Sequence, residues 1–344
     1  MYATMTAPVC STSCVFTRLR SNTPFRFHFA CACIWTWVEM ELRERKADTL
    51  KEKLTNHYHK RNFQTDEKDA SRYGQMFFWG MVFSLFFESQ FFLVPKLYWG
   101  DTWSMVINTV LVWFTLFECT INWMGTYFGQ NNFVTSEIKE EKFPGTAETP
   151  PGWINCPKCQ VDAPPRSHHC RLCNRCVLKR DHHCFFTNSC VGFYNQRFFV
   201  MFCIYMVWGN LYSLFLQLSY TTQTIPILSW DGLAYIPMVG LAYMFMGYIS
   251  LGELLLIVHS CFCFMCLCGG VFFLGWQLIL ACAGMTSYEA WKGIPWYQRT
   301  SLENVRSVFG SIWKIPFQLL FPFRVDQDGN GVEWIVRTKN VKYQ

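Results

Sequence analysis

Four long apolar runs constrain this chain more than any other feature of its sequence. The runs 76–94, 103–128 and 198–220 are each long enough to cross a hydrocarbon layer of roughly 30 Å as a helix. The fourth run, 235–283, is long enough for two crossings, or for one crossing plus a helix that does not span the layer. These runs predict an all-α polytopic membrane protein.

The composition excludes an ordinary soluble protein. Of the 344 residues, 51% are hydrophobic and 18% are aromatic, whereas only 16% are charged; soluble domains carry about 25% charged residues. The net charge of +6 is concentrated outside the apolar runs, which is typical of membrane topology. We therefore expect membrane lipid as a partner, and no nucleic acid.

The distribution of Lys and Arg predicts the topology. The loop 95–102 between the first two runs has one basic residue, Lys96, whereas both flanks of this helix pair are basic. The stretch 221–234 has no Lys or Arg, and the residues after 283 are basic again. Because basic segments stay in the cytosol, we expect four crossings, with the last near 261–283 and with 235–258 as an amphipathic or incompletely spanning helix.

These features divide the chain into five predicted parts. The N-terminal tail carries many charges between 41 and 72 and no clear signal peptide. The parts are a cytosolic tail (1–72), the first two transmembrane helices (73–128), a cytosolic linker with a cysteine-rich zinc domain (129–197), the third and fourth transmembrane helices with an intervening apolar segment (198–283), and a cytosolic C-terminal region (284–344).

Three carboxylates lie within the apolar runs, where a charge is costly. Glu88, Glu118 and Glu253 are interpreted either as a functional polar site, or as residues that form interhelical hydrogen bonds or lie near the membrane surface. The cysteines of the last run are interpreted as apolar packing. They are Cys261, Cys263, Cys266 and Cys268.

A second dense feature is a segment of 35 residues that contains seven cysteines and four histidines. Cysteines two residues apart suit the tight turns that surround tetrahedral zinc. A disulfide framework is the alternative, and the predicted cytosolic location argues against it. The residues are Cys156, Cys159, Cys170, Cys173, Cys176, Cys184 and Cys190, with His168, His169, His182 and His183.

Counting ligands predicts a free thiol. Seven cysteines with the candidate histidines supply two sites of four ligands and leave one cysteine over. A remaining cysteine beside a histidine and an aspartate is the pattern of an activated nucleophile.

At these residues the segment resembles the DHHC protein S-acyltransferases, or palmitoyltransferases. The likeness continues after the last run, where Thr286-Ser287-Tyr288-Glu289 resembles the family's Thr-Thr-x-Glu motif, and where a C-terminal aromatic and asparagine motif follows. The matching residues are Cys156, Cys159, Pro164, Arg166, His169, Cys170, Cys173, Cys176, Asp181, His182, His183, Cys184, Cys190, Asn195, Phe199, Thr286, Glu289, Tyr297, Asn304 and 308–310.

The resemblance implies two structural zinc ions and a role for each residue of the Asp-His-His-Cys motif. Cys184 is expected to be the nucleophile, His182 its base, and Asp181 the residue that orients His182; Thr286, Glu289 and Asn304 form a structural motif. The implied zinc ligands are Cys156, Cys159, His169 and Cys176 at one site, and Cys170, Cys173, His183 and Cys190 at the other.

The implied reaction is a ping-pong transfer of a palmitoyl group from palmitoyl-CoA to cysteines of cytosol-facing substrate proteins. The acyl tail is expected in a slot between aromatic-rich helices. Arg171, Arg175, Lys179 and Arg180 either contact the CoA phosphates or are ordinary loop charges. An endomembrane location, Golgi or ER, follows from the resemblance alone.

The sequence departs from the family pattern at three positions, and two other classes of function are alternatives to the acyltransferase. Phe185 and Phe186 stand where many members have Pro and Trp, and Ala163 replaces a basic residue, so reduced or selective activity is expected. A zinc-stabilised membrane scaffold without catalysis is the alternative function, and the intact Asp181, His182 and Cys184 oppose it. A RING-like ligase is disfavoured because the ligands do not alternate as its cross-brace requires.

Overall fold

The computed structural model describes residues 50–129, 132–321 and 327–334, with side chains from residue 67 onward. The expectations for the first 49 residues, including the absence of a signal peptide, lie outside the described residues. Residues 62–344 form one compact unit, which is described below by itself.

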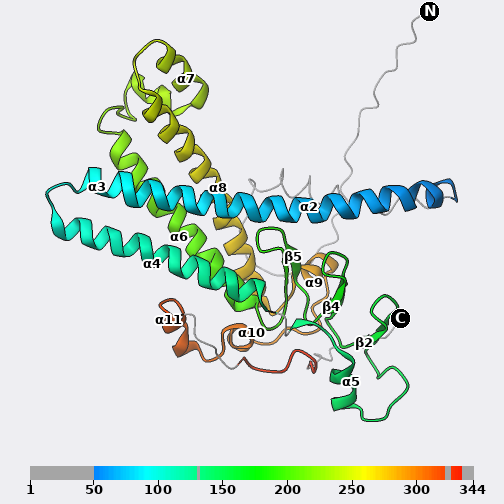
Figure 1. Cartoon of the computed structure of the whole chain (residues 1–344). Helices are drawn as coiled ribbons and strands as arrows, with labels where there is room; N and C mark the ends of the chain where they lie inside the picture. The colour runs from blue at the N-terminus through cyan, green and yellow to red at the C-terminus, as the bar shows by residue number, and fades with distance from the viewer. Residues whose placement is uncertain (1–49, 130–131, 322–326, 335–344) are drawn as a thin grey trace, which may run out of the picture. The chain divides into compact units, whose positions relative to one another are not determined.

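Four helices in the described residues are long and apolar enough to cross a membrane. The first consists of α2 (Leu50–Glu88), the π-helix η1 (Ser89–Leu93) and α3 (Val94–Leu97), with its candidate span at Glu67–Leu97; the others are α4 (Thr102–Tyr127), α6 (Gln196–Thr221) and α8 (Leu251–Ala283). The predicted fold class is therefore confirmed: the chain is a mostly helical, polytopic membrane protein with a cysteine-rich segment (Figure 1).

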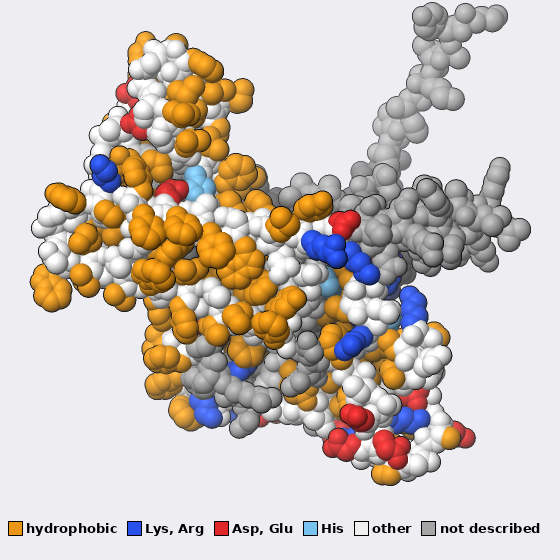
Figure 2. Space-filling view, viewed as in Figure 1, with side chains coloured by type: hydrophobic (Ala, Val, Ile, Leu, Met, Phe, Trp, Pro, Cys, Tyr) orange, Lys and Arg blue, Asp and Glu red, His pale blue; other side chains and the backbone are white. Residues whose placement is uncertain are grey.

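Helix α6 is the centre of the bundle. It packs along both α4 and α8, and also contacts η1 and α3. Half of its most apolar window is buried, against 17–28% for the other three spans. Figure 2 shows hydrophobic side chains over the visible surface of the helices. A surface of this kind is stable in lipid and not in water.

The region between α6 and α8 corrects one predicted boundary. It contains a 3-10 helix, η3 (Trp230–Tyr235), and α7 (Pro237–Phe245). With nine residues, α7 is about 14 Å long and cannot span a membrane. Helix α8 begins at Leu251, ten residues before the predicted start at 261, because Ser250 and Glu253 form a capping box there.

The three carboxylates of the apolar runs have different surroundings. Glu253 belongs to the capping box at the start of α8. Glu118 is fully buried and accepts a hydrogen bond from Asn122 of the same helix. Glu88 is bonded to residues of two other helices. Only Glu88 therefore forms the interhelical contact that the sequence suggested.

The cysteine-rich segment consists of one helix, α5 (Ser136–Lys142), and three short antiparallel hairpins. A residue with positive φ ends the turn of each hairpin: Gln160, Asn174 and Asn188, at φ of 50–54°. Asn tolerates this left-handed conformation better than most residues. The strand pairs are β1 (Ile154–Cys156) with β2 (Val161–Ala163), β3 (His168–Cys170) with β4 (Arg175–Val177), and β5 (His182–Cys184) with β6 (Ser189–Val191).

The chain after α8 folds into short helices with well-formed starts. Capping boxes begin α9 (Ser287–Lys292), with Thr286 and Glu289, and α10 (Ser301–Phe309), with Thr300 and Glu303. The 3-10 helix η4 (Ile312–Lys314) and α11 (Ile315–Gln318) follow.

A buried ion pair joins this last region to the cysteine-rich segment. Arg166 donates from Nε and Nη2 to the two carboxylate oxygens of Glu289, each at 2.6 Å, and from Nη2 to the carbonyl of Gly284 at 2.9 Å. The guanidinium lies 4.9 Å from the ring centroid of Tyr297 and 4.3 Å from that of Trp334. Both side chains of the pair are buried, so each charge depends on the other.

We expect Arg166→Met to lower the stability of the protein by about 3–5 kcal/mol, because it leaves the Glu289 carboxylate buried without its partner. Thermal unfolding of the purified protein in detergent measures the effect. Asp69→Asn is the matched control, since the Arg72–Asp69 pair is exposed and such pairs contribute about 1 kcal/mol or less. Equal shifts in the two variants would contradict this account of the buried pair.

Candidate active site and metal clusters

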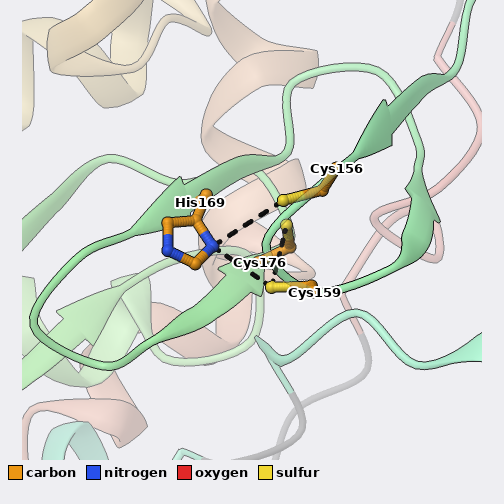
Figure 3. A group of neighbouring side chains, drawn as sticks. All are labelled: Cys156, Cys159, His169 and Cys176. Atoms are coloured by element: carbon orange, nitrogen blue, oxygen red, sulfur yellow. Dashed lines mark hydrogen bonds between the residues drawn. The ribbon is translucent and has the colours of Figure 1, made fainter.

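The first cluster of metal-binding side chains lies between β1, β3 and β4. Its four ligand atoms, from Cys156, Cys159, His169 and Cys176, all lie within 4.8 Å of one another. His169 Nδ1 is 3.1 Å from Cys159 Sγ and 3.8 Å from Cys156 Sγ, and the side chains converge on one point in Figure 3. Three thiols and one imidazole at this spacing fit a tetrahedral metal ion such as zinc.

The second cluster has the same composition. It consists of Cys170, Cys173, His183 and Cys190. His183 Nδ1 is 3.6 Å from the sulfur of Cys170, 3.4 Å from that of Cys173 and 3.7 Å from that of Cys190. Both clusters could therefore hold a metal ion, and their donor atoms are those that zinc prefers.

The hairpins show a 14-residue repeat that our ligand count overlooked. In each hairpin, a Cys-x-x-Cys turn or its equivalent is followed by the residue with positive φ. The third hairpin has Thr187 in place of the second cysteine. The equivalent positions are Cys156, Cys170 and Cys184; then Cys159, Cys173 and Thr187; then Gln160, Asn174 and Asn188.

This repeat explains why Cys184 belongs to neither cluster. Each cluster combines two cysteines of one hairpin with a histidine and a cysteine of the next hairpin. The third hairpin has no fourth hairpin after it among the described residues. Cys184 therefore occupies the first position of a cysteine turn that lacks its second thiol and its partners.

The alternation of β5 separates two kinds of chemistry. Residues one apart on a strand point to opposite faces, whereas residues two apart share a face. His183 faces the second cluster, so His182 and Cys184 share the other face of β5. There His182 lowers the pKa of the Cys184 thiol, and its Nδ1 lies 2.7 Å from Oδ2 of Asp181.

Asp181 is held by the chain that follows the cysteine-rich segment. Gln277 of α8 donates to Asp181 Oδ2 at 2.9 Å, and the backbone N–H of Ser287 donates to Oδ1. Asp181 and Gln277 are both buried. The carboxylate thus accepts three hydrogen bonds, from His182, α8 and the start of α9.

These contacts shift three pKa values in a consistent way. Burial raises the pKa of Asp181, but the hydrogen bond and charge of His182 outweigh it and lower the pKa to about 2. Burial lowers the pKa of His182, but Asp181 and Cys184 raise it to about 10. Burial raises the pKa of Cys184, but His182 and Thr187 lower it below 9.0. An imidazolium beside a thiolate is therefore favoured.

Apolar side chains of the bundle surround the thiol. Cys184 packs in one core with Phe78 of α2, Trp123 of α4 and Phe199 of α6. Trp123 Nε1 also donates to the carbonyl of Phe186 at 3.0 Å, which fixes the turn after the thiol. Cys184 thus lies where the cysteine-rich segment meets the membrane helices.

The four basic residues proposed for phosphate contacts differ in accessibility. Arg175 is exposed, and the Arg171 side chain is half exposed and lies 3.6 Å from Glu67. Arg180 is less accessible. Lys179 is buried, donates to Gln196 at 3.0 Å, and has its pKa lowered to about 7 by burial. The expectation that Lys179 contacts CoA phosphates therefore does not fit its position.

The three residues of the C-terminal motif, Thr286, Glu289 and Asn304, form hydrogen bonds at the end of α8 and the start of α9, next to Asp181. Thr286 and Glu289 form the capping box of α9, which places the Ser287 N–H against Asp181. Asn304 donates to the carbonyl of Cys282 at 2.9 Å near the end of α8. His168, to which no role was assigned, lies outside both clusters with its ring 4.4 Å from that of Tyr288.

Sequence reasoning did not find Gln277 or Trp123. Both lie within apolar runs, where their side chains looked like ordinary helix residues. Their partners are 96 and 63 residues away in the chain. An amide side chain within an apolar run is the one signal that could have pointed to Gln277.

Comparison with known proteins identifies the segment. Residues 153–294 match the sequence model of the family described as DHHC palmitoyltransferase. The palmitoyltransferase ZDHHC22 of Homo sapiens is 33% identical over 127 residues, which are 36% of this chain and 48% of that protein; ZDHHC22 of Rattus norvegicus gives the same values. ZDHHC22 of Danio rerio is 35% identical over 129 residues, 36% of this chain and 46% of that protein.

The chain spans about half the length of these curated relatives. The matched region contains both clusters, the Asp181–Cys184 strip, α6, α8 and α9. Residues 153–294 therefore belong to the DHHC palmitoyltransferase family.

Proposed function

We propose that this chain is a protein S-acyltransferase that moves a palmitoyl group from palmitoyl-CoA to cysteines of proteins. One observation carries the proposal. On one face of β5, Cys184 is paired with His182 and Asp181 and belongs to neither metal cluster. The thiol is thus free for covalent chemistry, at the point where an acyl chain can enter the apolar bundle.

The first step forms an acyl-enzyme. The Cys184 thiolate attacks the carbonyl carbon of palmitoyl-CoA, a C–S bond to Cys184 forms, and the C–S bond to CoA breaks. The CoA thiolate leaves and takes the proton of the His182 imidazolium. In the second step the thiol of a substrate protein gives its proton to His182 and attacks the acyl-enzyme, which restores the Cys184 thiolate.

Asp181 positions the base. Because its carboxylate binds Nδ1 of His182, the other ring nitrogen is left for Cys184. Gln277 donates to the same carboxylate oxygen as His182, and the Ser287 N–H donates to the other oxygen. One thioester replaces another, so the reaction needs little driving force. The residues therefore contribute orientation and nucleophile activation.

We assign zinc to both clusters as a structural ion. Four protein ligands close the coordination shell, and such zinc holds a segment together without binding a reactant. The segment needs this support because each hairpin has only three paired residues per strand. The ligands would thereby hold β5, and with it His182 and Cys184, against the bundle.

The apolar core around Cys184 supports a place for the acyl chain. Each buried methylene contributes about 0.8 kcal/mol, so an acyl chain gains by lying among membrane helices. Arg171, Arg175 and Arg180 remain candidates for the CoA phosphates. In this proposal the tail 1–72, the segment 129–197 and the region 284–344 face the cytosol of an endomembrane, where substrate cysteines lie near the membrane surface.

Incubation of the purified chain with radiolabelled palmitoyl-CoA should label Cys184. We expect a label that neutral hydroxylamine removes, because a thioester is cleaved by it, and we expect Cys184→Ser to abolish the label. Cys203→Ser is the matched control, since Cys203 lies in the same core and has no base. An unlabelled chain with its metal bound and its fold intact would favour a scaffold instead.

The reactivity of Cys184 should depend on pH and on His182. A thiolate is present above the pKa of its thiol, and His182 lowers this pKa below 9.0. We expect His182→Ala to move the midpoint of iodoacetamide alkylation to pH 9 or higher, and to slow alkylation at pH 7 by about tenfold or more. Peptide mass spectrometry of the metal-loaded protein between pH 6 and 10 measures this. An unchanged midpoint would remove His182 from the proposed pair.

Zinc content should separate a histidine that belongs to a cluster from one that does not. We expect His183→Ala to lose about one zinc ion per chain and to lower the melting temperature, because its imidazole is one of four ligands. His168→Ala is the matched control and should keep both ions. Elemental analysis of the purified proteins decides; equal zinc content in the two variants would refute the assigned ligands.

A further inference from the structure

A groove of about 480 Å³ lies between the first membrane helix and α8, away from Cys184. Its walls are mostly apolar and come from α2, η1 and α8. They include Met81, Phe92 and Leu255. Because these helices are membrane spans, whatever fills the groove comes from the bilayer.

A polar cluster lies on the wall of this groove. His259 of α8 bonds through Nδ1 to Glu88 of α2, and its Nε2 lies 3.1 Å from Oγ of Ser84. Gln217 of α6 donates to the second oxygen of Glu88 at 2.9 Å. Ser84, Glu88 and His259 all line the groove. The Glu88 and His259 side chains keep 16% and 18% of their surface exposed.

The Glu88 carboxylate keeps unused acceptor capacity, because its two oxygens can accept about four hydrogen bonds and they receive one each from His259 and Gln217. A hydrocarbon chain offers no hydrogen bond, and an ionisable side chain that faces it is costly. The contacts among Glu88, His259 and Gln217 satisfy part of the demand. A ligand in the groove whose hydroxyl lies against Glu88 would use the remaining acceptor capacity of this carboxylate.

The backbone beside the cluster is unusual as well. The π-helix Ser89–Leu93 begins directly after Glu88; Pro95, which has no N–H to donate, follows it. Short π segments within α-helices are frequent at functional sites. In addition, Ser89 Oγ, Gln90 Oε1 and Gln217 Oε1 are buried without a hydrogen-bond partner among the described residues.

The groove is separate from the acyl-transfer site. His259 and Gln277 are 18 residues apart on α8, which corresponds to about 27 Å along the helix. Gln277 contacts Asp181, so the groove lies far along the bundle from the Asp181–Cys184 strip. This distance excludes a direct role of Glu88 or His259 in the chemistry of Cys184.

The depth of the cluster suits the head of a small lipid. Helix α8 has 33 residues and is about 50 Å long, roughly 20 Å longer than the hydrocarbon layer. His259 lies about 12 Å from the Leu251 end of the helix. With the excess length shared between both ends, the cluster lies near the boundary between hydrocarbon and headgroups.

The charge of Glu88 determines which kind of lipid headgroup fits beside the polar cluster. The Glu88 carboxylate repels the phosphate of a phospholipid, whereas it accepts a hydrogen bond from a neutral hydroxyl. The Ser84 hydroxyl donates to the carbonyl of Met81 at 3.0 Å, and its oxygen can accept a hydrogen bond from the head. We propose that the groove binds a neutral membrane lipid with a hydroxyl head, of the sterol or ceramide type, through Glu88, Ser84 and His259.

Photolabelling of the full chain in lipid nanodiscs tests the proposal. Clickable, diazirine-bearing sterol and ceramide are the probes, and phosphatidylcholine with the same diazirine tail is the reference. We expect at least one hydroxyl probe to label α2 or α8 peptides of the groove about fivefold more than the reference, and its methyl ether to lose this advantage. Equal labelling by hydroxyl and reference probes overturns the proposal.

Two variants locate the binding. Leu255→Trp fills the groove without touching the polar cluster and should abolish the excess labelling. Met265→Trp is the matched control, because Met265 is a more exposed α8 residue outside the groove. Ser84→Ala should reduce labelling about two- to tenfold by removing one hydrogen bond. Equal labelling of the Leu255→Trp and Met265→Trp proteins would place the lipid elsewhere and refute the groove.

Discussion

The two tetrads of thiols and imidazoles are the contacts on which the cysteine-rich segment depends. Its hairpins pair only three residues per strand, and its two hydrophobic clusters include the ligand cysteines themselves. Each tetrad joins one hairpin to the next, so β3–β4 contributes to both. A metal in either cluster would therefore fix the direction of β5, and the orientation of His182 and Cys184 follows from that direction.

The site itself is assembled from both halves of the molecule. The cysteine-rich segment supplies Asp181, His182 and Cys184, whereas α8 and α9 supply the donors that hold Asp181. The buried pair of Arg166 and Glu289 keeps these regions together. A displacement of α8 would therefore move Gln277 and disturb the Asp181 carboxylate directly, whereas it would affect Cys184 only through Asp181 and His182.

Local patterns predicted the class of the fold and the presence of metal-binding turns, whereas the division of the ligands into two sets came from the resemblance to the family. Apolar length indicates a membrane helix wherever it occurs, and two-residue cysteine spacing indicates a turn. The early start of α8 was missed because the apolar run hid the Ser250 cap. The contacts of Gln277 and Lys179 were missed because each depends on a residue at least 17 positions away. For Glu88 the sequence suggested an interhelical contact but not its partners, His259 and Gln217.

Thr187 distinguishes the turn of Cys184 from the two turns whose cysteines belong to the clusters. A structural metal site such as that of zinc needs four ligands, and two of them commonly come from one Cys-x-x-Cys turn. Cys184 has the same turn as its counterparts, yet Thr187 removes the adjacent thiol. In the proposed function, the lack of a second thiol in this turn would therefore keep Cys184 from binding a metal ion and leave it available for acyl transfer.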